Sequence, residues 1–484
     1  MGHADPQHRD QSRVSDTTLV GGTRAASTLT LSQRLSRFAA GFAPALIPER
    51  TRERAKLLLL DATGIALASG RQDFAHRILS GLASISEGRS SLIGLPARLS
   101  LRDAVIMNGA LVHGLDYDDT HVRAIIHATA STFPCALSLA ESVDASGADF
   151  LAAYILGMEI AIRISDAAGG RFHDLGFHPT GLAAPFACAI QAGWFWGLSE
   201  EQLVMAQGLG CSTAAGSQEF LEEGAWNKRI HPGWGAAAGI TAAALARGGF
   251  KGPSRTYEGR YGLFRNYLGS HADQVDPEAL LRGLGEVWEI HEVAIKPYPI
   301  CHLIHACADA ALLLREQHSI RPEDIESITA LLPQPTLHIV AEPASIKMRP
   351  ANEYDAKFST HYVLATCMVR GRFGLPELRQ DALHDTAVLA LAQRVRCVVD
   401  PDARYPKYFS GGVEITLRDG RRFRHHEPIN RGAGERALSA AEIEHKFFDN
   451  ALTAVSRPRA ERIRDALFEV ERAPVQSLIE ALRA

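Results

Sequence analysis

A long alanine-, leucine- and glycine-rich region with helical periodicity constrains the fold of this chain more than any other feature. From about residue 29 to 280, segments such as RERAKLLLLDATGIALASG and DFLAAYILGMEIAIRISDAAG place apolar residues three and four positions apart, the spacing of a helix. Small residues on several faces favour helices that pack against helices on more than one side. Ser199 and Gln202 have the spacing of a capping box, which predicts the start of a helix.

The pattern changes near residue 285. IESITALLP and CVVDPDARYP are typical of strands, and VEITLRDGRRFRHH alternates apolar and polar residues around Asp419-Gly420, which indicates a hairpin. Helical periodicity returns in LSAAEIEHKFFDNAL, where Ser439 and Glu442 could form a second capping box. We therefore expect a mainly α fold, in which residues 29–292 and 437–484 build a large all-helical domain and residues 293–436 form a smaller, inserted α+β domain.

Composition argues against several classes of protein. Hydrophobic residues make up 46% and charged residues 22%, and the net charge is −4 with both signs scattered, so neither a nucleic-acid nor a membrane partner is expected. No apolar stretch is long enough for a membrane-spanning helix. Residues 1–28 contain no apolar core of a secretory signal and predict a disordered tail. The seven cysteines include no CxxC pair and are expected as small core residues of a reduced, cytoplasmic protein.

The stretch HGLDYDDTH, residues 113–121, places three aspartates, two histidines and a threonine inside this apolar region. If it is helical, at about 100° per residue, His113, Asp116 and Thr120 lie within one arc and Asp118 points away. Such an arc must face water or a polar cavity, because burying unpaired polar groups is costly. A solvated face with a helix end near Thr120 explains the same letters equally well.

Metal-dependent interpretations have less support. DYDD is similar to the diphosphate–magnesium helix of terpenoid cyclases, but no second acidic motif follows and aromatic residues are only 7%. A zinc site would need a second Cys/His pair elsewhere in the chain. The residues considered for such a site are Cys301, His302, His305 and Cys307.

Five further segments combine small residues with isolated polar side chains. They are IIHATAS, GFHPTGLAAPFA, WNKRIHPGWGAAAGITAAALA, VAIKPYPICHLIHACADA and NEYDAKFSTHYVLA. Any one of their polar residues has a structural explanation; for example, His178 before a proline could cap a helix, and Tyr362 could be a core residue. Together with HGLDYDDTH, in this order and at these spacings, the segments resemble the MmgE/PrpD family over about residues 30–475.

This resemblance implies a fold, an assembly and a set of site residues. The family includes 2-methylcitrate dehydratases, cis-aconitate decarboxylases and iminodisuccinate epimerases. Membership implies a helical domain built from both chain ends with an α+β lid, a homodimer, and catalysis without a metal or organic cofactor. The matching site positions are Asp116, Thr120, His127, His178, Lys228, Lys296 and Tyr362. Two positions depart from the family pattern: Ala128 replaces a proline, and Lys357 stands where glutamine is common.

All three family reactions make or quench negative charge beside a carboxylate, so they need cationic anchors and positioned acid–base groups. We expect Lys228 and Lys296, with His113 and Thr120, to bind the substrate. We expect the catalytic groups to be Asp116, His127, His178 and Tyr362, without dividing the general acid from the general base among them. Because these residues come from both predicted domains, the site should lie in the cleft between them.

The expected function is a cofactor-free lyase that acts on a di- or tricarboxylate. Dehydration of a 2-methylcitrate-like hydroxy acid is the first expectation, because it is a frequent assignment in the family. The alternatives are decarboxylation of cis-aconitate, epimerisation of an iminodisuccinate-type aminodicarboxylate and, in another class, a carboxylate-binding protein without turnover.

Overall fold

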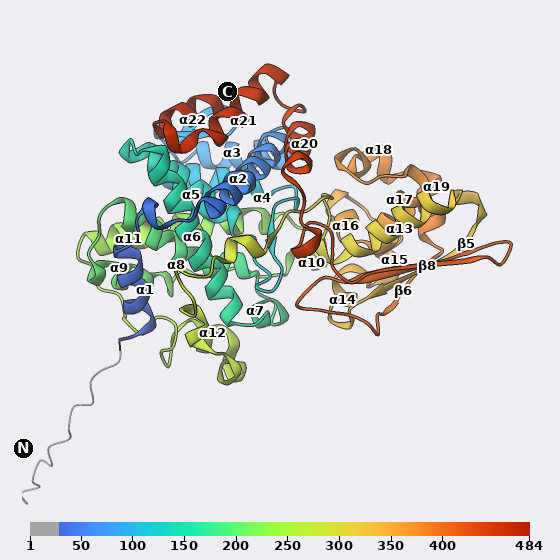
Figure 1. Ribbon diagram of the computed structural model, residues 1–484, viewed down its shortest axis with the longest axis horizontal. Coiled ribbons are helices and arrows are strands. Elements are labelled where there is room, and N and C mark those ends of the chain that lie inside the picture. The colour runs from blue at the N-terminus through green and yellow to red at the C-terminus, as the bar shows by residue number, and fades with distance from the viewer. Residues whose placement is uncertain (1–28) are drawn as a thin grey trace, which may run out of the picture.

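The computed structural model describes residues 29–484 and is mainly helical, with one four-stranded sheet (Figure 1). This confirms the predicted mainly α class. The predicted disordered tail, residues 1–28, lies outside the described residues. No helix from residue 29 onward combines the length and the apolar character needed to cross a membrane.

The larger hydrophobic core lies in a body of packed helices, on the left in Figure 1. Within it α8 packs against α6, α9 and α11, and α4 packs against α5 and α11. Close approach of α8 and α11 requires glycine, since a Cβ on Gly239 would lie 2.6 Å from the carbonyl oxygen of Pro185. The helices of this part are α1 (Leu31–Ala40), α2 (Glu49–Ser69), α3 (Asp73–Ala83), α4 (Leu101–His113), α5 (Thr129–Val143), α6 (Gly147–Ala167), α7 (Arg171–Asp174), α8 (Pro179–Phe195), α9 (Glu200–Gly210), α11 (His231–Arg247) and α12 (Leu263–Leu268). The short α10 (Phe220–Glu223) packs instead on the core around the four-stranded sheet.

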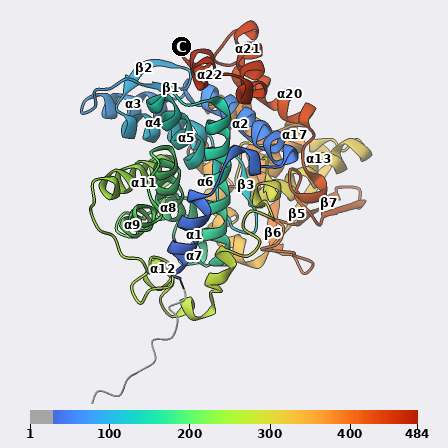
Figure 2. The ribbon, with the colours of Figure 1, turned by 60° about the vertical axis from the view of Figure 1, so that its left-hand side comes forward.

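The C-terminal helices return to this body. They are α20 (Ala440–Ala451), α21 (Arg457–Phe468) and α22 (Val475–Leu482), and α20 packs along α2, as Figures 1 and 2 show. Asp61 of α2 and Lys446 of α20 form a buried ion pair of 2.8 Å. Both predicted capping boxes are confirmed, at Ser199–Gln202 before α9 and at Ser439–Glu442 before α20.

A second core surrounds the four-stranded sheet, on the right in Figure 1. The strand order is β6-β5-β7-β8, in which β5 (Ile325–Leu332) is parallel to β6 (Val395–Val399) and antiparallel to β7 (Gly411–Leu417), and β7 is antiparallel to β8 (Arg422–Glu427). The predicted hairpin is confirmed, with Gly420 at φ +85° in its turn. The helices of this part are α13 (His305–His318), α14 (Leu337–Val340), α15 (Ala344–Lys347), α16 (Glu353–Lys357), α17 (Thr360–Arg370), α18 (Gln380–Leu383) and α19 (Thr386–Ala392).

Two short pairings complete the sheet content. β1 (Ser90–Leu92) pairs with β2 (Leu95–Leu99) at the edge of the helical body. β3 (Thr120–His121) pairs antiparallel with β4 (Val293–Ala294), with Thr120 opposite Ala294. This second pairing joins the HGLDYDDTH stretch to the segment that leads into the second core. The domain boundaries near residues 292 and 436, and the role of the inserted part as a lid, stay predictions.

Candidate active site

The HGLDYDDTH stretch is a turn followed by a short strand. Helix α4 ends at His113, Asp116 has φ +53°, and Thr120 and His121 form β3. A left-handed residue cannot continue a right-handed helix, so the assumption of a single helix through this stretch is wrong. The expected outward direction of Asp118 is also wrong, because its Oδ2 lies 2.7 Å from His113 Nδ1 and both side chains are buried.

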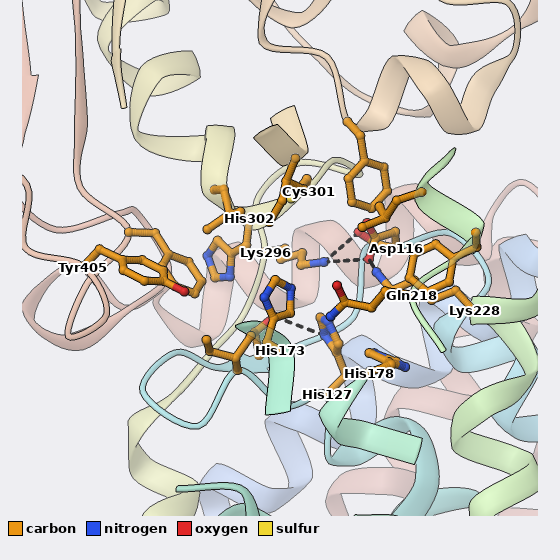
Figure 3. Close-up of a pocket in the computed structure, with 18 residues that line it drawn as sticks. Asp116, His127, His173, His178, Gln218, Lys228, Lys296, Cys301, His302 and Tyr405 are labelled. Atoms are coloured by element: carbon orange, nitrogen blue, oxygen red, sulfur yellow. Dashed lines mark hydrogen bonds and ion pairs between the residues drawn. The ribbon is translucent and has the colours of Figure 1, made fainter. Parts of the chain in front are cut away.

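A cavity lies between the helical body and the second core, and residues from both parts of the chain line it. Figure 3 shows polar side chains that converge on it from both parts of the chain. Its polar lining residues are Asp116, Thr120, His127, His173, His178, Gln218, Lys228, Lys296, Cys301, His302 and Tyr405, and its apolar lining residues are Ile125, Phe220, Leu221, Leu303, Ile339, Phe358 and Phe409.

Backbone strain is also concentrated at this cavity. Asp116 and Ile125, with φ of +53° and +52°, are two of the four non-glycine residues with positive φ in the described part of the chain. A β-branched residue such as Ile125 rarely adopts this conformation. Because strained residues cluster at functional sites, this observation independently marks the cavity as the candidate site.

Two lysines share the carboxylate of Asp116. Asp116 Oδ1 lies 2.9 Å from Lys228 Nζ and 3.1 Å from Lys296 Nζ, and Lys296 also donates to the Asp116 carbonyl oxygen at 2.9 Å. Burial raises the pKa of Asp116, but the two lysines outweigh it and hold that pKa well below its usual range. Burial lowers the pKa of Lys296, but Asp116 and Asp118 outweigh it and raise that pKa above its usual value.

His127 is held in one neutral tautomer. Its Nδ1–H donates to the Asp119 carbonyl oxygen at 2.7 Å, with Thr120 Oγ1 3.2 Å from the same nitrogen, and its backbone N–H donates to Thr180 Oγ1 at 3.1 Å. Burial lowers the pKa of His127 to about 3. The ring is therefore neutral near pH 7 and its Nε2 carries a lone pair, as a general base requires.

His178 lies beside a second histidine. It precedes α8, and its Nδ1 is 3.2 Å from Nδ1 of His231, so one of the two nitrogens donates to the other. Burial lowers the pKa of His178 well below its usual value and that of His231 to about 4. The Nε2 of His178 is buried without a hydrogen-bond partner in residues 29–484. It is therefore free to bind a ligand in the cavity that this residue lines.

The structure brings six of the eight predicted site residues to the cavity. His113 is one layer behind, with its ring centroid 4.9 Å from that of His127 and 5.3 Å from that of His178. Tyr362 is buried outside the lining, and its hydroxyl donates to the Glu377 carbonyl oxygen at 2.8 Å. The geometry therefore gives no support to direct substrate binding by His113 or to an acid role for Tyr362, and both stay predictions.

Several cavity residues were not singled out as site residues from the sequence. Cys301 and His302 follow Lys296 in the IKPYPICHLIH motif, so their proximity to Lys296 was the available signal. His173, five positions before His178, had the same signal, whereas Gln218 and Tyr405 lie in segments without it, and only the tertiary structure assigns them to the cavity.

One group of side chains has the composition of a metal site. His113, Asp118 and His127 are buried and offer ligand atoms within 4.8 Å of one another. The hydrogen bonds of the two Nδ1 atoms, to Asp118 and to the Asp119 carbonyl, account for this arrangement without an ion. Two of the residues considered for zinc also have hydrogen-bond partners in the protein. His302 Nε2 accepts from the amide nitrogen of Asn430, and His305 Nε2 donates to the Ile300 carbonyl oxygen.

Comparisons with known proteins cover most of the chain. The MmgE/PrpD N-terminal domain matches residues 33–275 and the MmgE/PrpD C-terminal domain matches residues 298–470. A cis-aconitate decarboxylase-like protein, oryM, of Aspergillus oryzae is 25% identical over 446 residues, which cover 88% of this chain and 92% of that protein. The cis-aconitate decarboxylase of Aspergillus terreus is 25% identical over 93% of this chain and 96% of its own. The human cis-aconitate decarboxylase is 27% identical over 85% of each chain.

Proposed function

The chain belongs to the MmgE/PrpD family, and from this premise we propose that it is a lyase that decarboxylates an unsaturated tricarboxylate of the cis-aconitate type. The observation that carries the proposal is the pair of lysines, Lys228 and Lys296, that converge on Asp116 in a buried cavity beside a neutral histidine. The choice of decarboxylation over the other family reactions is supported by the activity named for the relatives.

The charges of the cavity wall favour an anionic ligand. Lys228 and Lys296 are cations, and Asp116 supplies one negative charge. Burial keeps the other titratable groups neutral, because it lowers the pKa of His173 to about 4 and raises that of the Cys301 thiol to about 11. The side chains that line the cavity therefore sum to one positive charge, with the Asp118 carboxylate behind them beside His113, and the neutral donors of the lining can bind further carboxylate oxygens.

Decarboxylation would use these groups as follows. The bond between the allylic carbon and its carboxylate breaks, carbon dioxide leaves, and the electron pair shifts through the double bond to the carbon beside another carboxylate. Lys228 and Lys296 stabilise the enolate-like charge that develops there, and a proton is then delivered to that carbon. Buried cations such as Lys228 and Lys296 interact more strongly with this charge than they would in bulk solvent.

Dehydration of a 2-methylcitrate-like hydroxy acid is the second candidate, and the tautomer of His127 favours it. The lone pair on His127 Nε2 suits the removal of a proton alpha to a carboxylate, the first step of water loss. The same step begins epimerisation of an iminodisuccinate-type substrate. A carboxylate-binding protein without turnover would need the cations but not this base.

Proton NMR in D2O separates these reactions. The purified protein is incubated separately with cis-aconitate, 2-methylcitrate, citrate and iminodisuccinate. Itaconate formed from cis-aconitate supports the decarboxylase, and a new alkene signal from a hydroxy acid would replace it with a dehydratase. Deuterium uptake without net conversion would indicate an epimerase. Four unchanged spectra would contradict a lyase acting on these acids.

Matched variants test the site itself. Lys228→Met and His178→Gln should abolish turnover and α-proton exchange while circular dichroism shows an intact fold. Lys251→Met, which removes an exposed lysine, is the control and should retain full activity. Retained turnover in both site variants would show that the reaction occurs elsewhere.

We also propose a homodimer, which light scattering tests, and closure of the inserted part over the cavity.

A further inference from the structure

His302 lines the cavity from the second core and is buried. Figure 3 shows His302 and Tyr405 on one side of the Lys296 ammonium group, and Asp116 and Lys228 on the other side. The cavity therefore has a charged end, built around Asp116, and an uncharged polar end. The proposed function accounts for the charged end and leaves the role of the uncharged end open.

A chain of hydrogen bonds fixes the tautomer of His302. The backbone N–H of Phe409 donates to Asn430 Oδ1 at 3.1 Å, which identifies the oxygen of this fully buried amide. The amide nitrogen of Asn430 then faces His302 Nε2 at 2.8 Å and must be the donor, because it carries only hydrogens. His302 Nε2 is the acceptor, so a neutral His302 carries its proton on Nδ1.

This Nδ1–H group is buried and has no hydrogen-bond acceptor among the side chains and backbone of the described residues. A buried donor without a partner costs stability, and such groups in native proteins usually have a functional explanation. The neighbouring His305 has the opposite tautomer, because its Nε2–H donates to the Ile300 carbonyl oxygen at 3.2 Å. Of these two adjacent rings, His302 is the one that presents a free donor, and it is the one that lines the cavity.

We propose that His302 Nδ1–H binds a carboxylate oxygen of the substrate at the uncharged end of the cavity and thereby sets the orientation of a polycarboxylate. This inference rests on the proposed function, because it concerns the same substrate. With one carboxylate held at the lysines and a second held at His302, the long axis of the molecule is fixed between the two ends of the cavity. The scissile or reacting carbon then lies between the two ends, beside His127.

The charge state of His302 is consistent with this role. Burial lowers its pKa well below the usual value, so the ring is neutral near pH 7. A neutral donor binds a carboxylate through a directional hydrogen bond without adding a fixed cation. The lysine end and the His302 end are therefore chemically different, and a substrate with unlike carboxylates can distinguish them.

Binding of tricarballylate, a saturated tricarboxylate with no double bond to react, tests this role in the full-length protein. His302→Phe keeps an aromatic ring and removes the donor, and it should weaken binding about 10- to 100-fold, the effect of one hydrogen bond to a charged group. His302→Asn places an amide nitrogen near the position of Nδ1, whereas His302→Gln places one near that of Nε2. Asn should restore most of the affinity and Gln should not. The exposed His384→Phe is the control and should bind as the wild type does.

A second measurement reads the tautomer without any ligand. Nitrogen-15 NMR of the ring, assigned by the resonances missing from His302→Phe, should show a protonated Nδ1. A protonated Nε2, unchanged affinity in His302→Phe, or rescue by Gln instead of Asn would overturn the role of His302 alone. Wild-type protein that binds no tricarballylate and converts no cis-aconitate would overturn the proposed function as well.

Discussion

Asp116→Asn removes the charge that two buried lysines share. Lys228 Nζ has no other hydrogen-bond acceptor in residues 29–484 and otherwise faces the rings of Phe358 and Phe220, at 5.2 and 6.0 Å from their centroids. Lys296 keeps the Asp116 carbonyl oxygen at 2.9 Å. Loss of one partner of a buried ion pair typically costs about 3–5 kcal/mol. Because the asparagine oxygen can still accept one hydrogen bond, we expect a loss near 3 kcal/mol, roughly a 150-fold change in the unfolding equilibrium.

The assay is urea unfolding with and without tricarballylate. A carboxylate of the ligand can take the place of the missing aspartate, so ligand should stabilise the variant more than it stabilises the wild type. At 100 times its dissociation constant a ligand contributes about 2.7 kcal/mol, which would recover most of the loss. Full stability of Asp116→Asn without ligand would refute the reasoning, because the shared carboxylate would then contribute nothing.

Asp61→Asn is the matched control. It leaves Lys446 Nζ with the Tyr117 carbonyl oxygen at 3.0 Å, just as Asp116→Asn leaves Lys296 with a carbonyl oxygen. This pair joins α2 and α20, and neither of its residues lines the cavity. The control should lose stability without any additional stabilisation by tricarballylate, and equal recovery in both variants would show that the ligand acts elsewhere.

Three further outcomes are expected. Tricarballylate binding should take up protons in the pH range just above the free pKa values of His127 and His173, about 3 and 4, and weaken as pH rises there, because the polyanion raises both pKa values. Calorimetry in buffers of different ionisation enthalpy measures this, and no uptake would contradict it. The unfolding free energy should fall as pH drops from about 6.5 toward 4. The reason is that His127, His173 and His231 have folded pKa values of about 3, 4 and 4, so they bind protons in this range only after unfolding. Urea titrations at pH 7 and 5 test this. Dialysis against a chelator should leave cis-aconitate turnover unchanged, and a loss reversed by one metal would instead assign His113, Asp118 and His127 as its ligands.

The features that sequence reasoning predicted correctly depend on local interactions. The capping boxes before α9 and α20 and the Asp419-Gly420 turn are set by residues within a few positions of one another, so the local sequence is enough to predict them. Six residues of the family motifs line the same cavity, while their roles stay predictions: Asp116, Thr120, His127, His178, Lys228 and Lys296.

The features that were missed depend on contacts between distant segments. The end of α4 at His113 accompanies the pairing of Thr120 with Ala294, far along the chain, and helical periodicity contains no information about that partner. The tautomer of His302 likewise requires Asn430 and Phe409, which no local pattern connects to it. Tyr362 lies in a segment that matches the family motif, but its hydroxyl donates to the Glu377 carbonyl oxygen within the second core instead of facing the cavity.

The pairing of β3 with β4 ties the turn that carries Asp116 to the segment that carries Lys296. If the second core rotated about this pairing, each atom would move along an arc proportional to its distance from the pairing. Lys296, two positions beyond Ala294, would travel least, and the strands at the far end of the sheet would travel most (Figure 1). If the proposed closure pivots at this pairing, the contact between Lys296 and Asp116 would be kept while the entrance to the cavity opens farther away.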